Sequence, residues 1–193
     1  MCAVYDRGKS KVLEDRLSNF LKTHFLTLSN DTDIISVCYK LGLQAVYMPL
    51  NDSVDGLILV DGKHRIIAIK STLEPIDTRF LIAHELAHYI TAYDFADKKG
   101  APQFCVAAKD TLRHGSDKPQ LEHDMDYLAA AILVPFEQFK KELDSKKINY
   151  KNLHTESDVT SKFPIGVIKD FAKRYRVTQQ LIVRRIAEIS YYA

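Results

Sequence analysis

Two histidines and a glutamate interrupt one of the most apolar stretches of this chain. Residues 79–90 read RFLIAHELAHYI, in which His84, Glu85 and His88 are surrounded by aliphatic and aromatic side chains. A helix of this composition lies mostly inside a protein, where an unpaired polar group costs roughly 1 to 3 kcal/mol. The three polar side chains therefore need partners, which are either buried hydrogen-bonding groups or a bound metal ion.

The spacing of the two histidines favours a metal ion over a pair of hydrogen-bonded core histidines. Four residues of α-helix make nearly one full turn, so His84 and His88 lie one above the other and can bind one cation. Zinc fits best, because two imidazoles and one carboxylate leave a fourth position for water, as in catalytic zinc sites. Such a site makes the water acidic and polarises a carbonyl group. We expect Glu85 to take the proton of that water during amide hydrolysis.

A third ligand has to come from another part of the chain, and residues 121–126 offer several. This stretch, LEHDMD, contains Glu122, His123, Asp124 and Asp126 at the start of an otherwise apolar helix. Acidic side chains in a first helical turn also interact favourably with the helix dipole, so some of them can belong to a solvated helix end. The residue pattern alone leaves all four as ligands or as partners of ligands.

The elements around these residues predict an α+β fold, in which a small antiparallel sheet packs on the HExxH helix and the C-terminal half is helical. Asp61-Gly62 predicts a hairpin, since such pairs favour type I′ turns. Asp77 or Thr78 can cap the HExxH helix. Strands are predicted at 43–50, 56–60 and 65–70, with a further one around 104–107, and helices at 9–26, 32–41, 120–134, 135–143 and, as a pair broken near 176–178, 164–189. Residues 93–118 and 144–162 read mainly as irregular, and Pro119 and Pro135 flank the 120–134 helix.

The composition is that of an ordinary globular protein. The chain has 193 residues, of which 46% are hydrophobic and 27% charged, which argues against disordered and fibrous classes. A net charge of +2 argues against whole-protein affinity for nucleic acid or acidic lipid. The N-terminus lacks an apolar core and the longest apolar run, residues 129–136, is too short to cross a bilayer, so we expect a cytoplasmic protein. Three widely spaced cysteines do not suggest a disulfide framework.

Three blocks of the sequence together resemble the ImmA/IrrE family of zinc metallopeptidases. They are RFxIAHELxH at 79–88, AAxILVP at 129–135, which is similar to the family's AAxLLMP, and the hairpin at 55–70. The resemblance covers most of the chain from about residue 30. It implies a cytosolic regulatory peptidase, often carried by phages and integrative elements or paired in toxin–antitoxin fashion, that cuts a transcriptional repressor.

The resemblance also implies a third metal ligand. In that family a glutamate five residues before the paired alanines binds the zinc, and counting back from Ala129 gives Asp124. This chain departs from the family there, because an aspartate is one methylene shorter than a glutamate. We therefore expect the metal ligands His84, His88 and Asp124, with Glu122 and then His123 as alternatives to Asp124.

The C-terminal residues 160–193 are basic, with seven Lys and Arg side chains against Asp170 and Glu188, a net charge of plus five. They resemble a helix-turn-helix, although Arg176 stands where such turns often have glycine. The apolar stripe of these helices fits packing on the main domain, so we predict a metallopeptidase domain at 1–160 and a helical extension at 161–193. We do not expect direct DNA binding.

Three functions follow from these features. The first is a zinc peptidase that cleaves a helix-turn-helix repressor, and the second is a catalytically silent zinc-fold protein that regulates such a partner by binding. The third is a DNA-binding module with a structural metal, in which Arg184 and Arg185 would contact phosphates.

Overall fold

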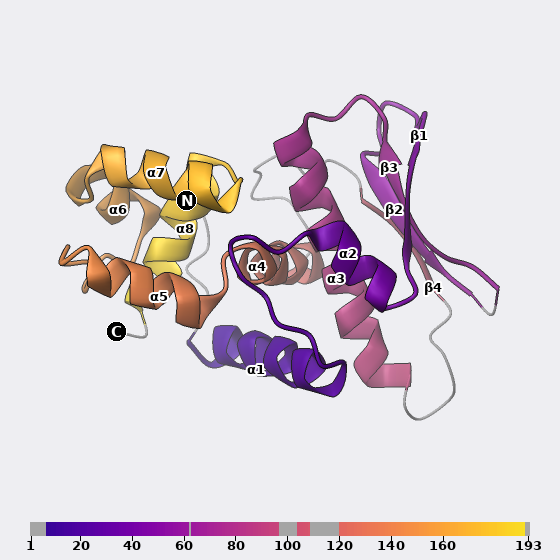
Figure 1. Ribbon diagram of the computed structural model, residues 1–193, viewed down its shortest axis with the longest axis horizontal. Helices are drawn as coiled ribbons and strands as arrows, with labels where there is room; N and C mark the ends of the chain where they lie inside the picture. Colours follow the sequence, from indigo (N-terminus) through magenta and orange to yellow (C-terminus); the bar gives the residue numbers. More distant parts are fainter. Residues whose placement is uncertain (1–6, 62, 97–103, 109–119, 192–193) are drawn as a thin grey trace.

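One helix, α3, separates a small sheet from a group of helices (Figure 1). The computed structural model describes residues 7–61, 63–96, 104–108 and 120–191. The strands are β1 (Gln44–Met48), β2 (Gly56–Val60), β3 (Arg65–Lys70) and β4 (Phe104–Ala108). The helices are α1 (Arg7–Thr23), α2 (Ile34–Lys40), α3 (Pro75–Ala96), α4 (Gln120–Leu133), α5 (Phe136–Ser145), α6 (Glu156–Lys162), α7 (Ile165–Tyr175) and α8 (Gln179–Ser190). The predicted α+β fold with a helical C-terminal half is confirmed.

The sheet is mixed, with the strand order β1-β3-β2-β4. β2 and β3 form the predicted antiparallel hairpin with Val60 opposite Arg65, and β2 also pairs antiparallel with β4. β1, however, pairs in parallel with β3, with Gln44 opposite Ile66. The expectation of a wholly antiparallel sheet was wrong at this edge, because the hairpin turns β3 back into the direction of β1 and places it next to that strand.

Helix α3 lies between the sheet and α4, which explains why its sequence is apolar on nearly every side. It contacts β2 and β3 on one face and α4 on another, and Leu81 and Ala83 are fully buried. Gly56 lets the sheet approach closely, since a Cβ there would lie 2.7 Å from Cδ2 of Leu81. The helix begins at Pro75, before the predicted caps, because a proline at a first helical position lacks only an amide that would be unpaired anyway.

The C-terminal half also contains a helix that the sequence analysis took for a loop. α6 follows Thr155, whose side chain accepts a hydrogen bond from the amide of Asp158 while the Asp158 carboxylate accepts one from the Thr155 amide. This capping box starts a helix of only seven residues, too short to show a clear apolar period.

The predicted pair of C-terminal helices is present as α7 and α8, and Arg176 between them adopts the left-handed conformation. Among the described residues, Cys38 is buried in the core as a free thiol. The predicted turn residue Gly62, Pro119 and most of the segment predicted as irregular lie outside the described residues. Within those residues, none of the helices has the length and apolarity that spanning a bilayer requires.

Candidate metal centre

The two histidines of α3 face the first turns of α4. His84 is fully buried and His88 is 5% exposed, and their ring centroids lie 5.0 Å apart. Successive turns of one helix place the two rings one above the other, as the four-residue spacing predicted. The sheet covers the opposite side of α3, and the partners of these imidazoles come from α4.

Glu122 of α4 is the carboxylate that reaches both imidazoles. Its Oε2 lies 3.1 Å from Nε2 of His84, and its Oε1 lies 3.5 Å from Nε2 of His88. Each of the three residues offers one ligand atom, and these atoms lie within 4.8 Å of one another. Hydrogen bonds with the two histidines hold the pKa of Glu122 well below its ordinary value. Two imidazole nitrogens and one ionised carboxylate are a donor set that zinc accepts.

Asp126, one turn after Glu122 on α4, holds the other nitrogen of His84. Nδ1 of His84 donates to Oδ1 of Asp126 over 3.0 Å, and Asp126 is 7% exposed. Burial lowers the pKa of His84, but the hydrogen bonds with Asp126 and Glu122 outweigh burial and raise it to about 9. A carboxylate on the far nitrogen of a ligand histidine is a common feature of metal sites, where it fixes the orientation of the ring.

The structure does not bring Asp124, the ligand expected from the resemblance, to the histidines. Its Oδ1 lies 2.9 Å from Nζ of Lys9 in α1 and accepts a hydrogen bond from Nε2 of Gln120. Two residues of α-helix turn a side chain by about 200°, so Asp124 and Glu122 point to opposite sides of α4. The geometry therefore favours Glu122, the alternative that the sequence analysis had kept, and His123 is not part of the group either.

The spacing of the carboxylates contained a signal that the sequence analysis did not use. Glu122 and Asp126 are four residues apart, the same separation as His84 and His88, so each helix presents one pair on one face. Two such pairs on packed helices can meet as three ligands and one orienting carboxylate. Counting residues back from the paired alanines identified Asp124 instead, and left Asp126 without a role.

Glu85 lies beside this group without a partner. It is fully buried, and neither of its carboxylate oxygens has a hydrogen-bond partner within the described residues. Burial raises the pKa of Glu85 to about 8, against the opposing effect of the neighbouring His84. A buried carboxyl group without hydrogen bonds is costly, and such groups occur where a protein uses them chemically.

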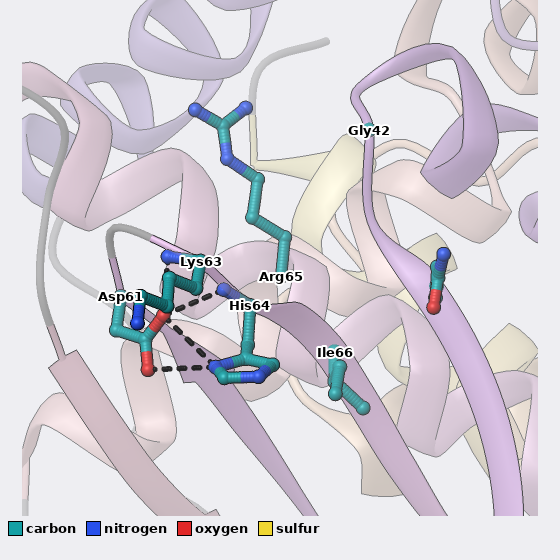
Figure 2. A pocket seen from close by; sticks show the side chains of 7 residues that line it. Gly42, Asp61, Lys63, His64, Arg65 and Ile66 are labelled. Carbon is teal, nitrogen blue, oxygen red and sulfur yellow. Dashed lines mark hydrogen bonds and ion pairs between the residues drawn. The ribbon is translucent and has the colours of Figure 1, made fainter.

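A hollow at the β2–β3 hairpin is lined in part by Asp61, Lys63 and His64, which hydrogen-bond to one another (Figure 2). The carboxylate of Asp61 accepts hydrogen bonds from the amides of Lys63 and His64 and from Nδ1 of His64. The His64 side chain and these amides lower the pKa of Asp61 to about 2. Asp61 and His64 are therefore engaged with each other, whereas the carboxylate oxygens of Glu85 on α3 are buried and have no hydrogen-bond partner within the described residues.

Comparison with known proteins identifies the family of this chain. Residues 38–187 match a peptidase family described as the IrrE N-terminal-like domain. The match includes the histidines of α3, the carboxylates of α4, all of α7, and α8 up to residue 187. A search of the curated proteins finds no match.

One of the similar solved structures is a transcriptional regulator from Mycobacterium tuberculosis. It has a TM-score of 0.50 and 14% sequence identity, and the comparison covers 93% of this chain and 46% of the regulator. The chain thus spans about half the length of that protein. At this level of identity the likeness shows the fold alone.

Proposed function

Since this chain belongs to the peptidase family of the IrrE N-terminal-like domain, we propose that it is a zinc metallopeptidase that cleaves a partner protein. The observation that carries the proposal is the convergence of His84, His88 and Glu122 beside a buried carboxyl group that has no other partner. Nε2 of His88 is likewise buried, and its contact with Oε1 of Glu122 at 3.5 Å is too long for a well-formed hydrogen bond. These orphaned polar atoms fit a cation better than they fit a closed hydrogen-bond network.

We assign His84, His88 and Glu122 as the ligands. When bound there, a zinc ion supplies Lewis acidity to a water molecule and to the scissile carbonyl group. Asp126 keeps Nδ1 of His84 protonated, so that Nε2 of the same ring is the free donor atom. Glu122 presents an ionised carboxylate at neutral pH, because both histidines hold its pKa low.

Glu85 follows a ligand in sequence but is not one itself. We propose that its carboxylate takes a proton from the attacking water and passes it to the leaving amine. A base is most effective when its pKa lies near the working pH, and burial raises the pKa of Glu85 toward neutrality.

The partner that we propose is a cytoplasmic transcriptional repressor, as the resemblance to the regulatory peptidases implies, rather than DNA. Arg184 and Arg185, which would serve a DNA-binding module, are engaged within the protein. Arg185 is fully buried and its Nη2 lies 2.6 Å from Oε1 of Glu14, while Nε of Arg184 lies 2.9 Å from Oε1 of Glu188. Neither side chain is available to phosphates without breaking these pairs.

The test is cleavage by matched glutamine variants. The helix-turn-helix regulator encoded nearest the gene is co-expressed with wild type, Glu85→Gln or Glu137→Gln, and mass spectrometry is used to search for one new terminus. Glu137 lies exposed on α5, so its replacement controls for the substitution itself. We expect cleavage by wild type and Glu137→Gln, and a loss of about 10² to 10⁴ in rate with Glu85→Gln at unchanged zinc content.

Two outcomes would contradict this assignment. Full-rate cleavage by Glu85→Gln would remove the role of Glu85. Tight binding without cleavage by any form, repeated under inducing conditions, would favour the catalytically silent regulatory partner.

A further inference from the structure

The cations of the C-terminal helices fall into two groups. Four of them are paired with acidic side chains, with nitrogen–oxygen distances of 2.6 to 3.0 Å. These are Lys162 with Asp158, Arg174 with Glu142, Arg184 with Glu188, and Arg185 with both Glu14 and Glu188. Two of these cations, Arg174 and Arg185, join different helices, the other two pair within one helix, and all four are engaged with carboxylates.

The other three cations, Lys169, Lys173 and Arg176, lie on one exposed face of α7 and its C-cap, which we call the α7 basic face. Their spacing of four and three residues places them on one side of the helix. Within the described part of the chain, none of these side chains has an ion pair or a hydrogen bond. Asp170, the acidic residue of α7, lies at the border of this face, about 100° from Lys169 and about 60° from Lys173 around the helix.

The same face is open along its length. Ile165 in the first turn is 60% exposed, and a Cβ added to Gly166 would meet no atom within 4 Å. An exposed aliphatic side chain next to three unpaired cations offers both apolar and ionic contacts to another molecule. No described element of this chain covers it.

Arg79, on the metal-binding helix α3, lies within electrostatic range of Arg176 in the α7 basic face. Its Nη1 donates to the carbonyl oxygen of Thr32 over 3.0 Å, and its Nε is buried without a partner. Burial and the nearby charge of Arg176 lower the pKa of Arg79, and Asp33 only partly opposes them. The positive charge of Arg79 adds to the attraction of this region for an anion.

Arg176 occupies a backbone position that favours glycine. Its backbone has φ 54° and ψ 49°, the left-handed conformation in which glycine carries no steric cost. Arginine is therefore a poor choice for stability at this C-cap. A role for its side chain explains its presence better than the turn does.

The shape of the α7 basic face fits an acidic protein segment better than a nucleic acid. Helix α8, which a helix-turn-helix would insert into the major groove, is almost wholly buried from Leu181 to Ser190 and cannot enter a groove. The three cations of α7 span only about 10 Å of helix, at 1.5 Å per residue. Carboxylates spaced by four and three residues on one face of a partner helix match that span.

We propose that the α7 basic face docks an acidic segment of the protein substrate, outside the metal centre. This inference rests on the proposed function, because it names how the substrate of that peptidase is held. The salt bridges at such a site are exposed. They raise the association rate and the affinity for the substrate, and they weaken as salt is added.

The binding test uses a fluorescent helical peptide of about 20 residues with glutamates along one face, a matched glutamine peptide and a DNA duplex of similar length. The basic-face variant combines Lys169→Gln, Lys173→Gln and Arg176→Gly, the last of which suits the left-handed backbone. The control variant removes the same charge elsewhere, at Lys22, Lys40 and Lys151, which are exposed on other elements. We expect the glutamate peptide to bind wild type and the control alike, and the basic-face variant about tenfold more weakly, with the difference lost in high salt.

Each other result overturns the proposal. Equal weakening in both triple variants would mean that only net charge matters, and absence of peptide binding to wild type would leave the face without this ligand. Tighter binding of the duplex than of the glutamate peptide would assign the face to nucleic acid, and a basic-face-dependent dimer would assign it to a second copy.

Substrate kinetics separate this inference from the proposed function. With the regulator as substrate, the basic-face variant should raise KM about tenfold at unchanged kcat and zinc content. An unchanged KM would overturn the docking site while leaving the peptidase intact. If no form cleaves the regulator, the peptide-binding measurement still decides whether the face recognises acidic segments.

Discussion

Glutamine or asparagine in place of three acidic residues of α4 should weaken zinc binding in a graded order. Glu122→Gln removes a ligand that lies 3.1 and 3.5 Å from the two imidazoles. Asp126→Asn weakens the hydrogen bond that orients His84. Asp124→Asn affects only contacts with Lys9 and Gln120 on the far side of the helix. The three changes are nearly isosteric, so differences among them report position.

The expected magnitudes follow from these contacts. Loss of an orienting partner typically costs 10- to 100-fold in metal affinity, which we expect for Asp126→Asn. Glu122→Gln should lower the affinity for zinc by about 100-fold or more, because a bond to the metal itself is lost. Asp124→Asn should stay within about fivefold, since an ion pair with partly exposed partners contributes at most about 1 kcal/mol.

The assay is competition for zinc against a chromophoric chelator, with circular dichroism to verify that each variant is folded. Wild type should bind about one zinc per chain. If Asp124→Asn weakened binding as much as Glu122→Gln, the register of α4 against α3 would be wrong and the expectation from the resemblance would be restored.

Three further predictions concern stability. In the presence of a chelator, the free energy of unfolding should fall as pH rises from about 6.5 to 9, measured by urea titration. The pKa values of His84 and Glu85 are raised to about 9 and 8, so the folded state holds more protons than the unfolded state in this window. Arg185→Met should destabilise the zinc-loaded protein by about 3 to 5 kcal/mol, because it leaves the partly buried carboxylates of Glu14 and Glu188 without their buried cation. Gly56→Ala should cost about 1 to 3 kcal/mol, as its Cβ would lie 2.7 Å from Cδ2 of Leu81.

Matched changes control for each of these effects. Glu85→Gln should reduce the pH dependence of the free energy of unfolding of the metal-free protein. An unchanged slope of that free energy against pH would contradict the raised pKa of Glu85. Arg184→Ala, at a partly exposed position, should cost less than about 1 kcal/mol. Gly166→Ala, which meets open space, should not destabilise, so equal losses at both glycines would contradict the packing argument.

Local periodicity predicted most elements and the chemistry of α3. The spacing of apolar residues and the positions of proline and glycine involve only residues that are close in the chain. For this reason the β2–β3 hairpin and the helix that contains His84 and His88 could be predicted. Strand order is not local, and the parallel pairing of β1 with β3 became visible only once the hairpin was placed beside it. The short helix α6 was missed because its signal is a capping box and not an apolar stripe.

The ligand set shows the same division between local and non-local information. Which face of α4 meets α3 decides between Glu122 and Asp124, and that depends on the packing of two helices separated in the chain. The pairing of Arg185 with Glu14, 171 residues away, likewise could not be read from the basic composition of the tail. The composition includes the positive charge of Arg185 in the net charge of the tail. Only the fold shows that this charge is buried and paired with Glu14.

Anomalous diffraction at the zinc edge, from crystals of Glu85→Gln grown with zinc, tests the central claim most directly. We predict one strong peak between α3 and α4, at about 2.0 to 2.2 Å from Nε2 of His84, Nε2 of His88 and the Glu122 carboxylate. Glu85 belongs to no ligand bond in this account, so its replacement should leave the peak in place. A peak bound through Asp124, or no peak at these histidines in zinc-replete crystals, would contradict the assignment of this site.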